Sequence, residues 1–467
     1  MPSSSRWFVL LVPSLLILYT LVGAMPAAEA APPKTEGGSG ECRKCSPDAG
    51  TGTDGGTSIP DGGTSDGGAG TPDGGTGTDG GCLAGPVLNS LGKDHLLVGG
   101  KTTSSVAGLA PFDVRYIYLA GGLFDSPTPC TSCQSCTTSG LTCSSLNPTG
   151  CKWWGCWQWD QLPPGQYLRD FLTETTTLGQ LPMITYYQML HASGVAEGTP
   201  EVDAAQDPAL MQRYFNDWRF VLKQIGTASV LLHIEPDFWG YAQHKSSNPH
   251  LLPAAVASVN STDCANQPNS IAGMGRCMIA MVRKYAPNAK VGLHASPWGS
   301  KIDVIQNRDA LLNVEAETYK VADFMRECGA ASGDFIVVEA SDRDAQYFQV
   351  IKGLDRWWDA SNASLPHFKQ GFRWARAMSE RLALPNLWWQ LPVGNMSLPG
   401  YDERWKDNRL DYFFDHPEEI AANHGIGMIF GAGEKGQTDP ATDLGHLVNR
   451  VNAHFITGGQ PVCGTTP

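Results

Sequence analysis

The sequence predicts an α/β fold, a TIM-like (β/α) barrel of seven or eight parallel strands with a disulfide-rich loop insertion. Short, nearly continuous apolar runs alternate along the chain with stretches whose apolar residues recur at helical spacing. Runs that are apolar on both faces are typical of parallel strands covered by helices. No Rossmann glycine fingerprint follows a strand, which favours a closed barrel over an open sheet.

Strands and helices are expected to alternate through most of the chain. The strands are expected at residues 114–121, 181–190, 229–238, 289–296, 334–340, 385–391 and 426–431. The helical patterns lie near residues 166–178, 207–225, 270–285, 310–328, 367–383, 409–423 and 443–455. Residues 95–100 read as an eighth strand, but the connection after them is too short for a helix, so the strand count stays at seven or eight.

Residues 1–30 are predicted to be a signal peptide. Arg6 is the only charged side chain before an uncharged run over residues 7–25. The small residues of Ala28-Glu29-Ala30 then fit a signal-peptidase site, which predicts cleavage after the last of them. Cleavage after Ala24, or retention of the run as an uncleaved membrane anchor, are the alternatives.

Residues 31–81 are predicted to form a disordered linker rich in Gly, Asp and Thr. From Gly50 to Gly81, 14 of 32 residues are Gly, and Asp-Gly-Gly occurs five times. Such a segment buries too little apolar surface to offset its ordering entropy, so we expect a flexible tether. The N-terminal segment could also associate the protein with the cell surface. Calcium-binding repeats carry an apolar residue in each repeat, and Ile59 is the only large one here. Residues 82–467 are expected to carry the barrel.

The composition excludes some partners and indicates a compartment. The chain has 33 Lys and Arg against 46 Asp and Glu, and this net charge of -13 argues against binding to nucleic acid or anionic lipid. The 14 Trp indicate a surface that stacks on flat, partly apolar ligands. The 13 Cys point to an oxidising environment, so a secreted or extracytoplasmic protein is expected.

Six cysteines gather in an insertion over residues 125–160. They are Cys130, Cys133, Cys136, Cys143, Cys151 and Cys156. Their spacing resembles an iron–sulfur or metal ligand set, but behind a signal peptide three disulfides are expected instead, with no metal and no cofactor. Cys264 and Cys277 are expected to pair locally, whereas Cys328 and Cys463 have no evident partner. The odd total leaves at least one thiol free or intermolecular.

The third clear strand ends in residues that suit catalysis. It reads His233-Ile-Glu235-Pro-Asp237-Phe-Trp239, and side chains alternate along a strand. His233, Glu235 and Asp237 are therefore expected to share one face and to point into the barrel mouth, where active sites of such barrels lie.

Carboxylates, imidazoles and indoles also follow the other strands. The predicted catalytic residues are Asp237, Glu235, Glu339, Asp342 and Asp344. The predicted substrate-binding residues are Trp239, Trp298, Trp388, Trp389, Gln390, His294, Tyr187 and His233. Paired acids and Trp platforms fit glycoside hydrolysis, in which one acid protonates the leaving oxygen and a second carboxylate activates water or attacks the sugar. The structural alternative for any one acid is a helix cap or an ion pair with Arg.

The run that ends in Ile234-Glu235-Pro236-Asp237 resembles the "apolar run, then Glu-Pro-Asp" motif of glycoside hydrolase family 6, the secreted cellulases. Further segments resemble the family's motifs in the same order: Ala286-Pro287-Asn288-Ala289 leading to Gly299, Phe335-Ile336-Val337-Val338 leading to Arg343, and Trp389-Gln390-Leu391-Pro392. The resemblance implies a distorted seven-stranded barrel and carries over Asp237, with Glu235 beside it, as the family's acid. The family's Arg-Asp-Cys acid motif is absent from residues 184–191.

The second acid is therefore expected on a neighbouring strand, and Glu339 is the nearest in chain order. One intervening strand would separate its backbone from that of Asp237 by about 10 Å. A gap that admits a water molecule between the carboxylates predicts inversion of the sugar anomer.

Three functions fit these residues. The first is a secreted, monomeric hydrolase of a polysaccharide or oligosaccharide. The second is a non-catalytic glycan-binding barrel on a tether, which the missing acid motif favours. The third is a divalent-metal hydrolase that uses His233, Glu235, Asp237 and His294.

Overall fold

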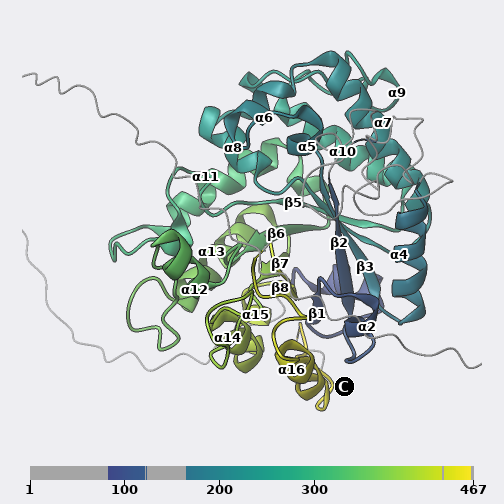
Figure 1. The fold of residues 1–467 in the computed structure, drawn as a ribbon. Helices are drawn as coiled ribbons and strands as arrows, with labels where there is room; N and C mark the ends of the chain where they lie inside the picture. Colours follow the sequence, from purple (N-terminus) through teal and green to yellow (C-terminus); the bar gives the residue numbers. More distant parts are fainter. Residues whose placement is uncertain (1–81, 121–122, 124–164, 434–435, 464–467) are drawn as a thin grey trace, which may run out of the picture. The chain divides into compact units, whose positions relative to one another are not determined.

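The protein folds into a closed barrel of eight parallel strands in the order β1 to β8, which confirms the predicted (β/α) barrel (Figure 1). The computed structural model describes residues 82–120, 123, 165–433 and 436–463. The strands are β1 (Leu97–Gly100), β2 (Val114–Ala120), β3 (Leu181–Tyr187), β4 (Leu231–Ile234), β5 (Lys290–His294), β6 (Phe335–Glu339), β7 (Asn386–Leu391) and β8 (Gly425–Phe430). The predicted signal peptide, linker and cysteine-rich insertion lie outside these residues.

The uncertain eighth strand is β1, and it closes the barrel by pairing with β2 and β8. Gly99 lies opposite Val114 on one side and Ile429 on the other. A Cβ atom at this glycine would lie 2.5 Å from the carbonyl oxygen of Val114, so the close approach of the strands requires glycine. Only the one-turn helix α2 (Ser104–Ala107) follows β1, which agrees with the short connection seen in the sequence.

The long helices that cover the barrel lie close to the expected positions. They are α4 (Gln166–Thr177), α7 (Pro208–Ile225), α10 (Ile271–Tyr285), α11 (Val314–Glu327), α13 (Phe368–Leu382) and α16 (His446–Phe455). The single helix expected over 409–423 is two helices, α14 (Arg409–Asp415) and α15 (Pro417–Ala422). Proline lacks a backbone N–H, so Pro417 ends the first helix and suits the first turn of the second.

Short helices occupy the loops between the main elements. They are α1 (Gly85–Ser90), α5 (Met189–Ser193), α6 (Thr199–Ala204), α8 (Phe238–Lys245), α9 (Ser261–Cys264), α12 (Ala345–Tyr347), the 3₁₀ turns η2 (Pro249–Leu251), η3 (Val304–Gln306) and η4 (Ala330–Ser332), and the π-helical turn η5 (Phe348–Lys352). Figure 1 shows α5, α6 and α8 grouped at one end of the barrel. These helices follow β3 and β4, so they build part of the rim at the C-terminal ends of the strands.

Two disulfides hold the described part of the chain. Cys264 pairs with Cys277, as expected from their spacing. Cys82 pairs with Cys463 across 381 positions, a partnership that the sequence did not reveal. Cys328 is buried as a free thiol. Among the described residues, no helix has the length and apolar character needed to cross a membrane.

Candidate active site

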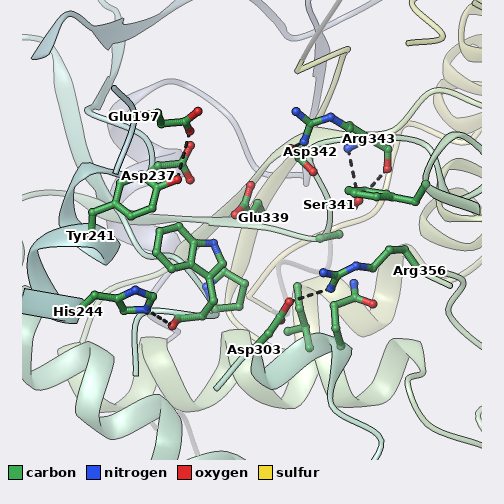
Figure 2. A pocket seen from close by; sticks show the side chains of 16 residues that line it. Glu197, Asp237, Tyr241, His244, Asp303, Glu339, Ser341, Asp342, Arg343 and Arg356 are labelled. Atoms are coloured by element: carbon green, nitrogen blue, oxygen red, sulfur yellow. Dashed lines mark hydrogen bonds and ion pairs between the residues drawn. The ribbon is translucent and has the colours of Figure 1, made fainter. Parts of the chain in front are cut away.

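A cavity of about 430 Å³ opens at the C-terminal ends of β4, β5 and β6 (Figure 2). Asp237 lines it from the loop after β4, Trp298 from the loop after β5, and Glu339 from the last position of β6. The rest of the wall comes from loops: Glu197, Tyr241, His244, Pro297, Asp303, Ile305, Gln306, Ala340, Ser341, Asp342, Arg343, Phe348 and Arg356. Most of the charged side chains on this wall are acids.

Asp237, Glu339 and His294 meet in one group at this cavity. One carboxylate oxygen of each acid and one ring nitrogen of His294 all lie within 4.8 Å of one another. The Nε2 atom of His294 lies 3.7 Å from Oε1 of Glu339. The two acids therefore form a pair although another strand lies between β4 and β6 in the barrel.

Burial and like charge keep a proton on this pair near neutral pH. Burial, helped by the charge of Glu339, raises the pKa of Asp237 to about 7. Burial, with a smaller contribution from Asp303, raises the pKa of Glu339 to about 7. Two carboxylates this close do not both ionise easily, so one acid and one carboxylate coexist around pH 7. This is the state that acid–base catalysis needs.

The prediction that Glu235 faces the barrel mouth is wrong. Strand β4 ends at Ile234, and positive φ angles of 50° at Glu235 and 66° at Asp237 replace the expected strand alternation. The Glu235 carboxylate is fully buried and accepts hydrogen bonds from the backbone N–H groups of Gln188 and Met189, each at 3.1 Å. It also accepts one from the Tyr214 hydroxyl at 2.6 Å. Glu235 thus joins β4 to the β3–α5 turn and to α7, and it does not line the cavity.

The two predicted acids after Glu339 have different positions. Asp342 lines the cavity and forms an ion pair with the neighbouring Arg343. Asp344 is buried and accepts backbone hydrogen bonds from Gly394 at 3.1 Å and Thr438 at 2.9 Å. It therefore connects the loops after β6, β7 and β8, outside the cavity, and the expected catalytic role does not fit this position.

Of the four predicted tryptophans, only Trp298 lines the cavity. Its ring lies 4.9 Å from that of Tyr241 and 5.1 Å from that of His244, and the carbonyl oxygen of Trp298 accepts a hydrogen bond from His244. The rim position expected for Trp239 is wrong. That ring is 1% exposed, and its Nε1 donates to the carbonyl oxygen of Ile234.

The two tryptophans of β7 point to opposite sides of the barrel wall. Trp388 packs outward on Phe372 and Phe413 of the covering helices, so its expected contact with substrate is wrong. Trp389 points inward and packs 4.5 Å from the ring of His233 and 5.7 Å from that of His294, below the cavity. Both indoles are buried, so neither offers a face to a ligand.

The remaining predicted binding residues lie beside or beneath the acids. His233 is buried inside the barrel. Gln390 has a positive φ of 56° and accepts a hydrogen bond from the Tyr118 hydroxyl. Tyr187 is half-buried, and its pKa is raised by burial and by the charge of Asp237.

Several cavity residues were not found from the sequence. Tyr241 donates a hydrogen bond to Glu197 at 3.2 Å, beside Asp237, and Asp303 pairs with Arg356 at 3.0 Å (Figure 2). These side chains come from loops and short helices, where neither strand alternation nor helical spacing indicates direction. The sequence offered one indication of their role: each of their segments follows one of the strands β3, β4, β5 and β6, at the end of the barrel where the cavity lies.

Asp237, His294 and Glu339 also supply the oxygen and nitrogen atoms that divalent cations bind. Ligand atoms of a tetrahedral zinc site lie roughly 3.4 Å apart, given Zn–N and Zn–O bonds near 2.1 Å. The 3.7 Å between His294 and Glu339 is slightly wider, so a cation would need a small inward movement of these side chains. The metal site expected from the sequence also included Glu235. That carboxylate cannot join the group, because its hydrogen bonds to Gln188, Met189 and Tyr214 hold it away from the cavity.

Comparisons with known proteins found similarity only to solved structures. No protein-family model matches the chain, and no curated protein matches it. An endo-β-1,4-mannanase from Thermotoga petrophila is 10% identical with a TM-score of 0.41, over 78% of this chain and 77% of that one. An endo-β-1,4-mannanase from Cellulomonas fimi is 11% identical with a TM-score of 0.43, over 80% and 73%.

Family 6, which the sequence motifs resemble, is represented among these structures by the endoglucanase Cel6 from Mycobacterium tuberculosis. It is 11% identical with a TM-score of 0.26, over 49% of this chain and 57% of that one. The similar solved structures thus include mannanases as well as this endoglucanase.

Proposed function

We propose that the protein is a secreted glycoside hydrolase that cleaves a polysaccharide or oligosaccharide with Asp237 and Glu339 as its catalytic pair. The observation that carries this proposal is the acid pair itself. Two carboxylates, one from the loop after β4 and one from the end of β6, lie within 4.8 Å of each other in a cavity of about 430 Å³. The pKa of each is raised to about 7.

Asp237 acts as the acid and Glu339 as the nucleophile. Glu339 lies nearer to the His294 ring nitrogen, which favours the ionised carboxylate if that nitrogen carries a hydrogen. The charge on Glu339 in turn helps to keep Asp237 protonated. Asp237 then protonates the glycosidic oxygen while Glu339 attacks the anomeric carbon, and a water molecule completes the reaction after Asp237 has become the base.

The separation of the acids favours retention, in place of the inversion expected from the sequence. Retaining pairs lie about 5–5.5 Å apart, whereas inverting pairs lie about 6.5–9.5 Å apart to admit a water. The nearest carboxylate oxygens of the two acids lie within 4.8 Å of each other, and a separation of the whole carboxyl groups only slightly larger than this would suit the first class. The carboxylates come closer together than the expected backbone spacing of about 10 Å because both side chains line the mouth of the barrel.

Trp298 and Tyr241 form the sugar platform. Their rings are in contact on the cavity wall, and indole faces stack on the apolar face of a pyranose. No cofactor is required for this chemistry. The two disulfides support an oxidising compartment, in keeping with a signal peptide over 1–30 and a linker over 31–81.

The test is reducing-sugar release from a panel of plant, fungal and bacterial glycans by the purified protein. Activity that disappears in Asp237→Asn and in Glu339→Gln supports the proposal. Glycan binding without product would instead support the non-catalytic barrel. NMR of the first product anomer distinguishes retention from inversion.

A divalent-metal hydrolase is the second candidate, and the donor group Asp237, His294 and Glu339 favours it. Activity that is lost on chelation and restored by zinc or manganese would support this candidate. Full activity in the presence of chelator would support the paired-acid mechanism.

A further inference from the structure

A line of polar side chains crosses the interior of the barrel beneath the acid pair. Thr185 on β3 lies 3.1 Å from Nδ1 of His233 on β4, and Nε2 of His233 lies 3.1 Å from Nδ1 of His294 on β5. Nε2 of His294 then faces Glu339 on β6 at 3.7 Å. Thr185, His233 and His294 are all fully buried. Four successive strands therefore contribute one residue each to this line.

Both imidazoles are neutral in this environment. Burial, with the neighbouring His294, holds the pKa of His233 well below its usual range. Burial lowers the pKa of His294 to about 4, although the charge of Asp237 opposes this change. A neutral imidazole has one N–H donor and one acceptor nitrogen, so the hydrogens of the line can run in one of two directions.

The neighbouring charge selects one direction. If the hydrogens run toward β6, the Thr185 hydroxyl donates to His233, His233 donates to His294, and the Nε2–H of His294 points at Glu339. In the opposite direction, a lone pair of His294 would face an ionised carboxylate inside the barrel, and the two would repel. Among the described residues, Nε2 of His294 has no hydrogen-bond partner that would compensate, and the carboxylate of Glu339 lies 3.7 Å from it.

We infer that Thr185 and His233 are positioning residues that fix the tautomer of His294, so that its N–H faces Glu339 and keeps it the ionised member of the acid pair. This inference rests on the proposed function, because the ionised Glu339 that selects the direction is the nucleophile proposed there. Neither residue lines the cavity, so both act through His294.

Other charged groups also face this part of the site. Asp237 acts on His294 from the loop after β4, and Asp303 and Arg343 act on Glu339 from the loops after β5 and β6. Trp389 packs on both imidazoles and carries no charge. Substitutions of Thr185 and His233 leave all of these groups in place. A change in the pH profile of such a variant therefore reports on the line of hydrogen bonds.

The direct test is nitrogen-15 NMR of the histidine rings in the full-length protein, with no variant required. The expected result at pH 7 is a protonated Nε2 and an unprotonated Nδ1 for both His233 and His294. A protonated Nδ1 on His294, or a charged imidazolium, would overturn the inference whether or not the protein hydrolyses any glycan. Absence of hydrolysis with the expected tautomers would count against the proposed function alone.

Variants test the catalytic consequence with matched controls. His233→Met removes the donor to His294, and Thr185→Val removes the hydroxyl. We expect kcat to fall about ten- to hundredfold in His233→Met with KM nearly unchanged. The acidic limb of the pH profile should also move to higher pH, because Glu339 loses an oriented donor. His233→Gln retains an amide donor and Thr185→Ser retains the hydroxyl, so both should recover part of the rate. An unchanged acidic limb in well-folded His233→Met would overturn the catalytic role.

Discussion

Asp237 follows β4 and Glu339 ends β6, two strands that do not pair, yet their carboxylate oxygens lie within 4.8 Å of each other. His294, on the strand between them, reaches the same point from below. The barrel therefore brings together two acids separated by about a hundred positions in the chain. The proposed acid–base chemistry depends on the short distance between them.

Asp237→Asn and Glu339→Gln should each lower turnover by about a thousandfold or more, because each removes one half of the acid–base pair while keeping shape. Initial rates on the most active glycan measure this, and circular dichroism checks the fold. Asp170→Asn, at an exposed position on α4, is the matched control and should retain wild-type activity. Near-wild-type turnover in Asp237→Asn would remove that residue from the mechanism.

Glu235→Gln should keep substantial activity, since Glu235 does not line the cavity. All three of its hydrogen bonds reach the same oxygen, which the glutamine carbonyl can replace. Glu235→Ala leaves buried donors without an acceptor and should lower the free energy of unfolding by about 2–4 kcal/mol. Chemical denaturation measures the difference. A complete loss of activity in folded Glu235→Gln would return this residue to the catalytic group.

The pH dependence of kcat/KM should be a bell with its maximum near pH 7. Below the maximum the nucleophile gains a proton, and above it the acid loses one, because the pKa of each group is raised to about 7. Rates measured from pH 4 to pH 10 in buffers of constant ionic strength check this. A flat profile across pH 5–9 would contradict the paired-acid mechanism.

The same raised pKa of Asp237 predicts how stability changes with pH. The folded state holds the proton more tightly than the unfolded state, so this contribution to stability is complete below pH 4 and is lost as the pH rises through 7. Asp237→Asn removes the titration. Its melting temperature should therefore exceed that of the wild type at pH 8 by more than it does at pH 5.

Trp298→Ala should raise KM about tenfold or more, because it removes an aromatic platform from the cavity wall. Trp239→Phe is the informative comparison, since that ring is buried and contacts no ligand site. It should lower the melting temperature and leave KM unchanged. Equal effects of the two substitutions on KM would refute the assignment of Trp298 as the platform.

The alternation of apolar runs and helices was enough to predict the barrel, because parallel strands covered on both faces must be apolar throughout. Glu339 was predicted to lie at a strand end, and it is the last residue of β6. The first strand was harder to assign because β1 has only four residues and no long helix follows it. Its identity depends on pairing with β8, which is distant in the chain.

Side-chain direction at strand ends was the main source of error. Alternation holds only while the backbone stays extended, and β4 stops at Ile234, so Glu235 and Asp237 point in different directions. In β7, Trp388 and Trp389 do point to opposite sides, but the sequence could not tell which of the two faces inward. The loop residues Tyr241 and Arg356 followed no periodic rule at all.

The bond between Cys82 and Cys463 makes the described domain a covalent ring, because it joins positions near the two ends of that domain. A protease that cuts the backbone once, at any loop between these cysteines, opens the ring but releases no fragment. Both pieces remain attached and can stay packed around the same barrel. In an environment rich in proteases, a single nick would therefore be visible on a reducing gel before it separated any part of the domain.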